Sequence, residues 1–377
     1  MTTHHAIAVA GAGLGGLTLA NVLRRNGIDV SLYDLDASPA ARGQGGMLDI
    51  HVETGQAALR DAGLFDGFER IIHAGGQETR VLDRHATVLH HGADDGGRPE
   101  VRRGDLRDLL LSGLPEGAIH WGSKIARASA LGDGRHRVEL DNGDDFTTDL
   151  LIGADGAWSR IRPLVSDAAP AYSGISFVEL ELLDAANRHP APAELFGGGM
   201  LFALAPGKGI LGHREPDGRL HLAVALSVAE DWLDSLDLSD VDAVKTELLG
   251  YLSDWDASLR GMVAAADGEV VPRRIHALPA DHRWDHARGV TLLGDAAHLM
   301  SPFAGEGANA AMLDGARLAT ALLAHPDTDS AVEAYERQLF PRAATAAAES
   351  LEGMELCFGA DTPTTLVAMF QRVPPQD

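Results

Sequence analysis

The sequence of 377 residues has one cysteine, few basic residues and no long apolar run. A single thiol, Cys357, cannot form an internal disulfide, so we expect a cytoplasmic protein. Lysine and arginine number 31 against 55 aspartates and glutamates, and the net charge of −24 argues against nucleic-acid and anionic-membrane partners. No stretch reaches the roughly 18 apolar residues of a transmembrane helix, and the glycine cluster within residues 6–23 does not fit a signal peptide.

Hydrophobic residues make up 45% of the chain, which is enough for a large core. The length allows two domains, or one domain with an insertion. Near the start, a short apolar stretch at 6–10 precedes a glycine cluster, an amphipathic stretch that ends at Gly27, and a second apolar stretch at 29–34. This order predicts a strand, a helix and a strand, the beginning of a mononucleotide-binding βαβ unit.

The cluster GAGLGG at 11–16 has the spacing of a pyrophosphate cradle. Gly11 permits a tight turn, Gly13 lets phosphates approach the backbone, and Gly16 lets the helix and strand pack closely. The helix N-terminus adds unpaired N–H groups, and an acidic residue at the end of the second strand is expected to bind an adenosine ribose. The motif alone does not choose between FAD and NAD(P). The predicted cofactor-binding residues here are Gly11, Gly13, Leu14, Gly15, Gly16, Asp34 and Leu35, with Asp36 close behind.

Later parts of the chain predict an inserted sheet and a return to the first domain. Between 172 and 226, short apolar stretches alternate with turn signals, which is typical of an antiparallel sheet. Helices are expected at 229–236 and 241–266, then a strand at 290–293 and a helix to about 324. The last long element, at 330–357, is alanine-rich and predicted to be helical with an interruption near Pro341.

Two further motifs identify the class of cofactor. LIGADGAWSRIR at 151–162 and LLGDAAHLMSPFAGEGAN at 292–309 each run from an apolar stretch into a glycine–aspartate turn. Together with GAGLGG they resemble, in order and in residues, the three motifs of class A flavoprotein monooxygenases of the para-hydroxybenzoate hydroxylase type. The resemblance covers nearly the whole chain and implies an α/β fold: a Rossmann-like FAD-binding domain, an inserted antiparallel-sheet substrate domain and a long C-terminal helix.

The third motif also has a physical explanation in terms of a flavin. Asp295 at a strand end can accept hydrogen bonds from ribityl hydroxyls, and Gly305 and Gly307 leave the backbone bare so that a ring edge can lie against it. The helix that begins near Ala308 points its positive end at this edge, which stabilises a reduced, anionic flavin. The resemblance adds four residues, of which the arginines could instead be a solvated basic edge: Arg42, Gly43, Arg103 and Arg107. The remaining predicted cofactor contacts are Asp155, Gly156, Gly294, Asp295, Pro302, Gly305, Gly307, Ala308 and Asn309.

Within this family the stretches RGQGGMLDIH, RRGDLRDLLL and SDWD are most similar to the tetracycline-inactivating monooxygenases. His221 matches a histidine that faces the substrate there, and strand alternation places it opposite Leu220 and Leu222. Glu179 and Met200 stand where that branch carries a glutamine and an arginine, so the ligand can differ from tetracycline. The predicted catalytic residues are Pro302, Gly305 and His221, and the predicted substrate-binding residues are Glu179, Met200, His221, Phe303 and Gly305.

The resemblance implies an FAD-dependent hydroxylase of a planar aromatic or enolic compound, such as a tetracycline or an aromatic polyketide. NADPH or NADH reduces the flavin transiently, dioxygen is the co-substrate, and a flavin C4a-hydroperoxide transfers oxygen. The alternatives are a flavoprotein reductase or dehydrogenase of the same fold, and a non-catalytic protein that binds aromatic drugs. We expect a monomer without a metal site. The predicted domains are an FAD-binding domain at 1–72, 84–170 and 268–328, a substrate domain at 73–83 and 171–267, and a bridging helix at 329–360.

Overall fold

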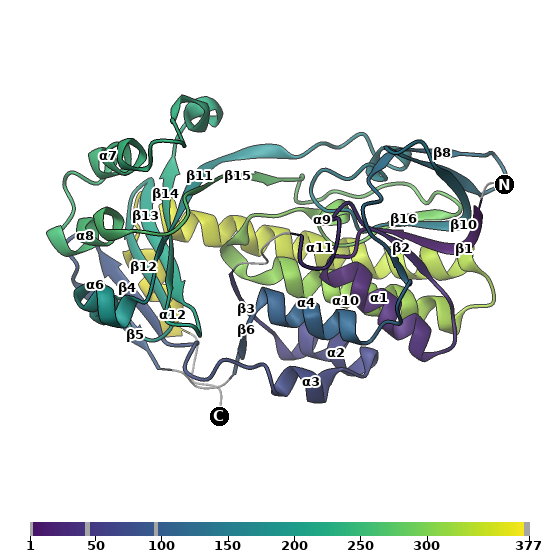
Figure 1. Ribbon diagram of the computed structural model, residues 1–377, viewed down its shortest axis with the longest axis horizontal. Helices are drawn as coiled ribbons and strands as arrows, with labels where there is room; N and C mark the ends of the chain where they lie inside the picture. The colour runs from purple at the N-terminus through teal and green to yellow at the C-terminus, as the bar shows by residue number, and fades with distance from the viewer. Residues whose placement is uncertain (1–2, 42–45, 94–96, 373–377) are drawn as a thin grey trace. The chain divides into compact units, whose positions relative to one another are not determined.

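The computed structural model describes residues 3–41, 46–93 and 97–372, and the chain divides into two compact units. Unit 1 comprises Met1–Ile72, Arg103–Ala171 and Ala277–Ser350, and unit 2 comprises His73–Arg102, Tyr172–His276 and Leu351–Asp377. The colour gradient in Figure 1 shows that each unit is assembled from separate stretches of the chain. Among the described helices, none is long and apolar enough to cross a membrane.

Unit 1 contains a mixed sheet and a layer of helices. Its elements are β1 (Thr3–Ala10), α1 (Leu14–Arg25), β2 (Ser31–Tyr33), β3 (Met47–Asp49), η1 (Val52–Gln56), α2 (Ala57–Ala62), α3 (Phe65–Glu69), α4 (Arg103–Ser112), β7 (Ile119–His120), β8 (Ile125–Ala130), β9 (His136–Leu140), β10 (Asp145–Gly153), η2 (Arg162–Leu164), β16 (Val290–Leu292), α9 (Asp295–His298), η4 (Pro302–Ala304), α10 (Glu306–Ala324) and α11 (Thr328–Phe358), which continues into unit 2.

The sheet of unit 1 follows the order β7-β2-β1-β10-β9-β8, and β16 also pairs with β10. Strands β7, β2, β1, β10 and β16 are parallel neighbours, whereas β8 and β9 form an antiparallel meander on β10. The C-terminal halves of β1 and β10 and the short strand β16 are mostly apolar and buried, as expected for strands covered on both faces. This is the predicted mononucleotide-binding arrangement with a later strand returning to it.

Helices α1 and α10 cross in unit 1 with almost no side chains between them. A Cβ built on Gly15 would lie 2.6 Å from the carbonyl oxygen of Ala311, and one built on Gly315 would lie 2.3 Å from the carbonyl oxygen of Gly15. The small residues after position 308 therefore have a structural task, which is to let two backbones touch. A flavin edge, which we expected at Gly305 and Gly307, therefore does not account for the small residues farther along this helix.

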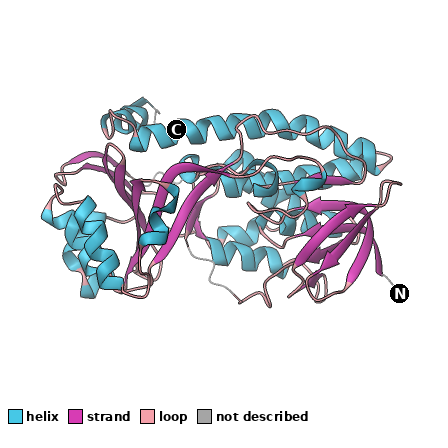
Figure 2. Ribbon diagram, turned by 90° about the horizontal axis from the view of Figure 1, so that it is seen from above, coloured by secondary structure: helices cyan, strands magenta, loops and turns pink. Residues whose placement is uncertain are grey.

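Unit 2 is built on a second sheet of order β15-β11-β14-β13-β12-β4-β5. One face of this sheet packs on the helices α6 to α8 with alternate residues such as Leu180, Leu222 and Val224, and the pairing is mostly antiparallel (Figures 1 and 2). The elements are β4 (Thr79–Asp83), β5 (Val88–Gly92), β6 (Glu100–Arg102), β11 (Ala171–Leu182), α5 (Ala185–Arg188), α6 (Pro190–Phe196), β12 (Met200–Ala205), β13 (Lys208–Arg214), β14 (Leu220–Ser227), η3 (Glu230–Ser235), α7 (Val241–Tyr251), α8 (Ala257–Ala265), β15 (Val271–Ala277) and α12 (Thr364–Arg372).

Some boundaries differ from those expected. Residues 84–102 lie in unit 2 and not with the FAD-binding segments, because β5 pairs with β4; β15 likewise joins unit 2. The predicted helix 241–266 is two helices, since Asp256 accepts the backbone N–H of Ser258 and caps a new start. Helix α11 runs through Pro341 without the predicted interruption. Its buried neighbours, such as Leu339 and Ala343, favour the helix over the local preference of proline.

Candidate functional site

The three motifs meet at one edge of the sheet of unit 1. The register pairs Ala10 with Tyr33 and with Gly153, and pairs Gly153 with Leu292. The strands β1, β2, β10 and β16 therefore end side by side, and the loops that follow them begin there. In sheets of this kind ligands bind beyond the carboxyl ends of the strands, so this edge is the candidate cofactor site.

The GAGLGG loop has the shape of a cradle. The N–H of Gly11 donates to the carbonyl of Tyr33 at 2.8 Å, and the φ of Gly11 is +105°. A Cβ on Gly11 would lie 2.2 Å from the carbonyl oxygen of Ala154, and one on Gly16 would lie 2.3 Å from that of Gly11. By contrast, a Cβ on Gly13 would meet nothing within 4 Å. No side chain among the described residues caps the start of α1, so its first N–H groups and the open space at Gly13 can receive a pyrophosphate.

The carboxylate of Asp34 holds the ends of two loops. It accepts the N–H of Ala12 at 2.7 Å with one oxygen and the N–H of Asp36 at 2.8 Å with the other. Leu35, between the two aspartates, is 61% exposed. Asp34 therefore shapes the loops as well as lying where a ribose is expected.

Arg107 is buried beside this loop. Its guanidinium donates to the carbonyl of Pro39 at 2.7 Å, lies 3.6 Å from the carboxylate of Asp36 and stands 5.4 Å from the ring centre of Trp121. Arg103 is exposed at the start of α4, and its N–H donates to the carbonyl of Gly46. Arg42 and Gly43 lie outside the described residues, so their predicted contacts stay predictions.

In the second motif, Asp155 has one carboxylate oxygen bonded to the N–H of Arg160 at 2.7 Å. Its other oxygen, Oδ1, is buried and has no hydrogen-bond partner within the described chain, and burial raises the pKa of this carboxyl group. The adjacent Gly156 has open space where a Cβ would be. An unsatisfied buried acceptor beside an open backbone is a place for a ligand hydroxyl or a water molecule.

Arg162 connects the second motif to the third, a role that sequence analysis did not assign. It is buried, and its guanidinium donates to three carbonyl oxygens, those of Ala157 at 2.6 Å, Ala168 at 3.1 Å and Ala296 at 3.1 Å. No carboxylate forms an ion pair with it in the described chain. A sequence could show only that an arginine follows the turn, because its partners are backbone atoms of distant residues.

The third motif is held from beneath by a buried ionic network. Asp314, fully buried on α10, accepts the N–H of Gly294 at 3.0 Å and is bonded at 2.6 Å to both His298 and Arg342. Burial alone would lower the pKa of His298, but the Asp314 charge outweighs it and the pKa is raised. Asp295 follows Gly294, is half-buried, and no described residue donates a hydrogen bond to its carboxylate. Its oxygens are thus available to a ligand.

The start of α10 contains both predicted and unpredicted groups. Gly307 has open space at its Cβ position, whereas a Cβ on Gly305 would lie 2.9 Å from Asp49. The side chain of Asn309 is committed, because its amide donates to the carbonyls of Asp49 and Gly305 and accepts the N–H of His51. The predicted contact between Asn309 and the cofactor is therefore limited to the backbone of Asn309.

The rest of this helix start is built from Pro302, which is exposed, and Phe303 and Ala308, which are half-buried. Two carboxylates that were not predicted, those of Asp49 and Glu306, lie beside them. His51 joins the two, because one ring nitrogen lies 2.8 Å from Asp49 and the other lies 3.0 Å from Glu306. The two acids flank the N-terminal end of α10, where the helix dipole favours negative charge.

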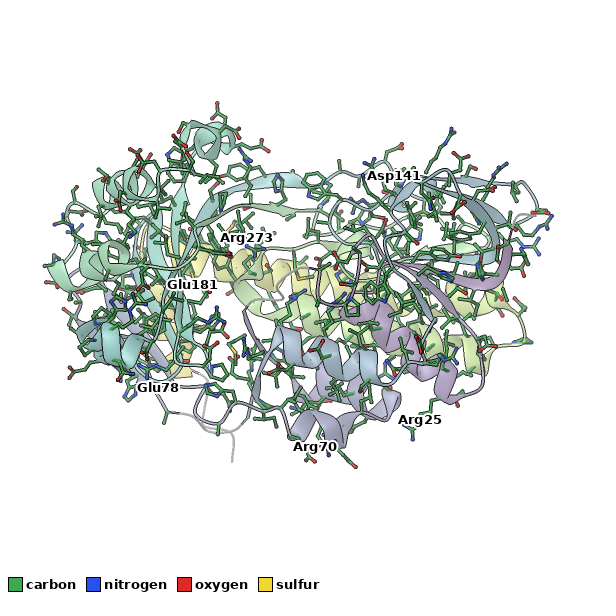
Figure 3. All side chains as sticks on the ribbon, viewed as in Figure 1. Arg25, Arg70, Glu78, Asp141, Glu181 and Arg273 are labelled. Atoms are coloured by element: carbon green, nitrogen blue, oxygen red, sulfur yellow. The ribbon has the colours of Figure 1, made fainter. Side chains whose placement is uncertain are left out.

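In unit 2, three predicted substrate residues share one face of the sheet, opposite the core. His213 pairs in register with Met200 and with His221, and Glu179 lies one alternate position away on β11. Arg273 (labelled in Figure 3), which was not predicted from the sequence, forms an ion pair with Glu179 at 2.5 Å. Burial alone would raise the pKa of Glu179, but His221 and Arg273 outweigh it and the pKa is lowered.

The features of unit 1 fit FAD: an open phosphate cradle, an unsatisfied buried acceptor at Asp155, a free carboxylate at Asp295 and the uncapped start of α10. Residues 4–350 match the FAD binding domain family. Monooxygenase penA of Penicillium thymicola is 30% identical over 91% of this chain and 93% of that protein.

Two solved structures share the fold. Klebsiella pneumoniae HpxO in complex with FAD and uric acid has a TM-score of 0.80 at 22% identity, covering 98% of this chain and 92% of that one. The tetracycline destructase Tet(55) has a TM-score of 0.76 at 20% identity, covering 98% and 95%. The chain belongs to the FAD binding domain family and is an FAD-dependent monooxygenase.

Proposed function

We propose that the enzyme uses NADPH or NADH and dioxygen to hydroxylate a planar aromatic or enolic compound, such as a tetracycline or an aromatic polyketide. The observation that carries this proposal is the convergence of the three motif loops at the carboxyl ends of β1, β2, β10 and β16. The uric acid bound by HpxO and the tetracyclines named for Tet(55) are planar ring systems, which supports the substrate class.

Bound FAD would accept a hydride from the nicotinamide and activate dioxygen for transfer to the substrate. The residues of the chain would supply position and electrostatics. Gly13 and the start of α1 would hold the pyrophosphate, Asp295 the ribityl chain, and Asp34 the adenosine ribose. The start of α10 would hold the pyrimidine edge electropositive, because its N–H groups carry partial positive charge. On unit 2, Met200 and His221 would contact the substrate.

The test is a screen of tetracyclines, rifamycins, aromatic polyketides and simple phenols with the yellow, FAD-loaded enzyme. We expect one compound to stimulate NADPH or NADH oxidation and to gain one oxygen atom that derives from ¹⁸O-labelled dioxygen. Asp295→Ala should lose FAD, whereas the exposed control Asp108→Asn should retain it. Reduction of the compound under anaerobic conditions, without oxygen incorporation, would contradict hydroxylation and support a reductase of the same fold.

A further inference from the structure

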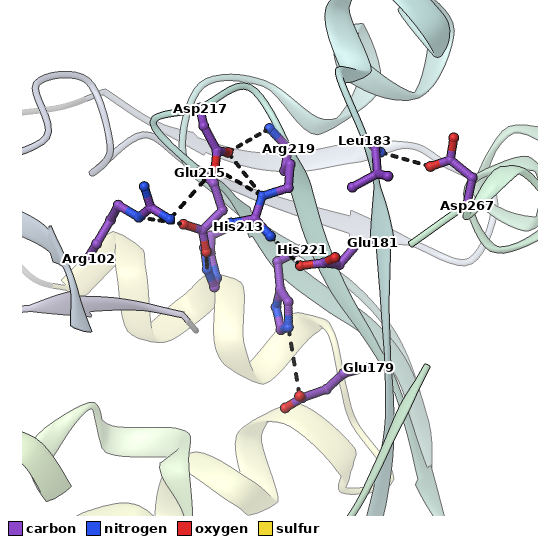
Figure 4. Close-up of polar contacts among 10 residues, drawn as sticks. All are labelled: Arg102, Glu179, Glu181, Leu183, His213, Glu215, Asp217, Arg219, His221 and Asp267. Atoms are coloured by element: carbon purple, nitrogen blue, oxygen red, sulfur yellow. Dashed lines mark hydrogen bonds and ion pairs between the residues drawn. The ribbon is translucent and has the colours of Figure 1, made fainter. Parts of the chain in front are cut away.

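The face of the unit 2 sheet opposite its core, on which Phe202 also meets Phe370 of α12, carries a line of ion pairs around two histidines. The imidazole rings of His213 and His221 are stacked with their centres 5.2 Å apart. His213 lies 3.1 Å from Glu215 and His221 lies 3.8 Å from Glu179, so each ring has a carboxylate beside it (Figure 4). The outer oxygens of these carboxylates contact arginines, Arg102 at 3.7 Å and Arg273 at 2.5 Å. On each side an arginine contacts a glutamate and that glutamate lies beside a histidine, and the two histidines stack on each other.

The ionised side chains of this face have a net negative charge that one additional proton would neutralise. Among the described residues, the ion-paired groups of this face are Arg102, Arg219 and Arg273, and Glu179, Glu181, Glu215 and Asp217. Three cations against four anions leave one negative charge while both imidazoles are neutral. One imidazolium ion would make the face neutral. Burial lowers the pKa of His213 in spite of Glu215, so this ring is a poor proton acceptor.

His221 is accessible to a ligand and held in place. Its side chain is 21% exposed, and its Nδ1 atom has no hydrogen-bond partner in the described part of the chain. The charged and titratable neighbours of His221 come from several strands. Glu179 and Glu181 lie beside it on β11, and His213 lies beside it on β13. Arg273 of β15 pairs with Glu179, and Arg219, just before β14, pairs with Glu181. A histidine with a carboxylate 3.8 Å from one nitrogen and a second nitrogen open to a ligand can act as a general base.

We propose that His221 accepts a proton from an acidic hydroxyl group of the substrate, and that Glu179 is a positioning residue that stabilises the resulting imidazolium. The proposal rests on the proposed function and narrows its substrate class to phenols and enols. The substrate O–H bond breaks, the proton moves to His221, and the electron pair stays on the substrate oxygen. The anion is more electron-rich than the neutral compound, which favours oxygen transfer to its ring. Burial keeps His213 neutral in spite of Glu215, whose other oxygen lies 3.7 Å from Arg102.

The test uses alizarin, a planar polycyclic phenol whose anion absorbs at longer wavelengths than oxidised flavin. It is titrated into the FAD-loaded enzyme without any nicotinamide, at a pH at which the free dye is neutral. We expect the wild-type enzyme to bind the dye as its anion, with its pKa lowered by about one unit or more. His221→Gln and Glu179→Gln should bind it in the neutral form. The matched exposed controls His85→Gln and Glu247→Gln should behave as the wild type.

A dye that fails to bind, stays neutral on the wild-type enzyme, or ionises equally on His221→Gln would overturn the assignment. The readout needs no turnover, so it is separate from the oxygenation assay. Oxygenation of aromatic compounds that is unchanged in His221→Gln would refute the base and leave the proposed function standing. An ionised dye on an enzyme that oxygenates none of the compounds would refute the proposed function alone.

Discussion

The buried network of Asp314, His298 and Arg342 allows a test of what stabilises the Gly294–Asp295 turn, where the cofactor is expected to bind. In Asp314→Asn the side chain keeps its size but loses its charge, so His298 and Arg342 remain without the anion that pairs with them. Asp314 is fully buried and accepts three hydrogen bonds. Removing the charge of one partner of such a buried pair lowers the free energy of unfolding by about 3 kcal/mol or more.

The loss has a defined dependence on pH. The pKa of His298 is raised above its usual 6.5, so its contribution is complete below that pH and disappears as pH rises through the folded-state pKa. The pKa of Asp314 is lowered from 3.8, because His298 and Arg342 outweigh its burial. Its contribution is present above pH 3.8 and is lost as pH falls through the lowered value. The stability difference between wild type and variant should therefore be largest between pH 3.8 and 6.5.

The assay is urea unfolding of the FAD-free protein from below pH 3.8 to well above pH 6.5, followed by tryptophan fluorescence, with Asp108→Asn on the exposed side of α4 as the control. FAD affinity measured beside it should also fall, since Asp314 holds the N–H of Gly294 at the turn before Asp295. A difference of less than about 1 kcal/mol at pH 6, where a buried pair should cost several, would refute the assignment. So would a difference that is the same at every pH.

Three further predictions concern single positions. Gly307→Ala should leave the unfolding free energy within about 0.5 kcal/mol, since the new methyl group meets nothing, yet weaken FAD binding in a fluorescence titration. Gly315→Val should cost about 1–3 kcal/mol in urea unfolding, because its Cβ would lie 2.3 Å from a backbone oxygen of Gly15. Burial alone would lower the pKa of His286, but two carboxylates outweigh it and raise the pKa; the stability advantage over His286→Gln should be complete below pH 6.5 and vanish as pH rises through the folded-state pKa.

The sequence was informative where the chemistry is local. A strand that ends in glycine and aspartate can be recognised in sequence, and parallel pairing then brings three such ends together. The sequence could not show that the side-chain amide of Asn309 forms hydrogen bonds with Asp49 and His51, or that Ala311 touches Gly15, because these partners are far apart in the chain. The arginine partner of Glu179 was missed for the same reason. A single ion pair between strands leaves no periodic pattern to read.

The net charge of −24 is a poor guide to the charge at the cofactor edge. There the guanidinium of Arg162 donates to three carbonyl oxygens, and His298 and Arg342 both pair with Asp314 beneath the Gly294 turn. The start of α1 and the start of α10 add partial positive charge. An acidic surface keeps the protein dispersed, whereas these buried groups act at short range and in a low dielectric. A cofactor with a pyrophosphate and an anionic reduced ring therefore meets local donors at this edge, beside the carboxylates of Asp34, Asp155 and Asp295.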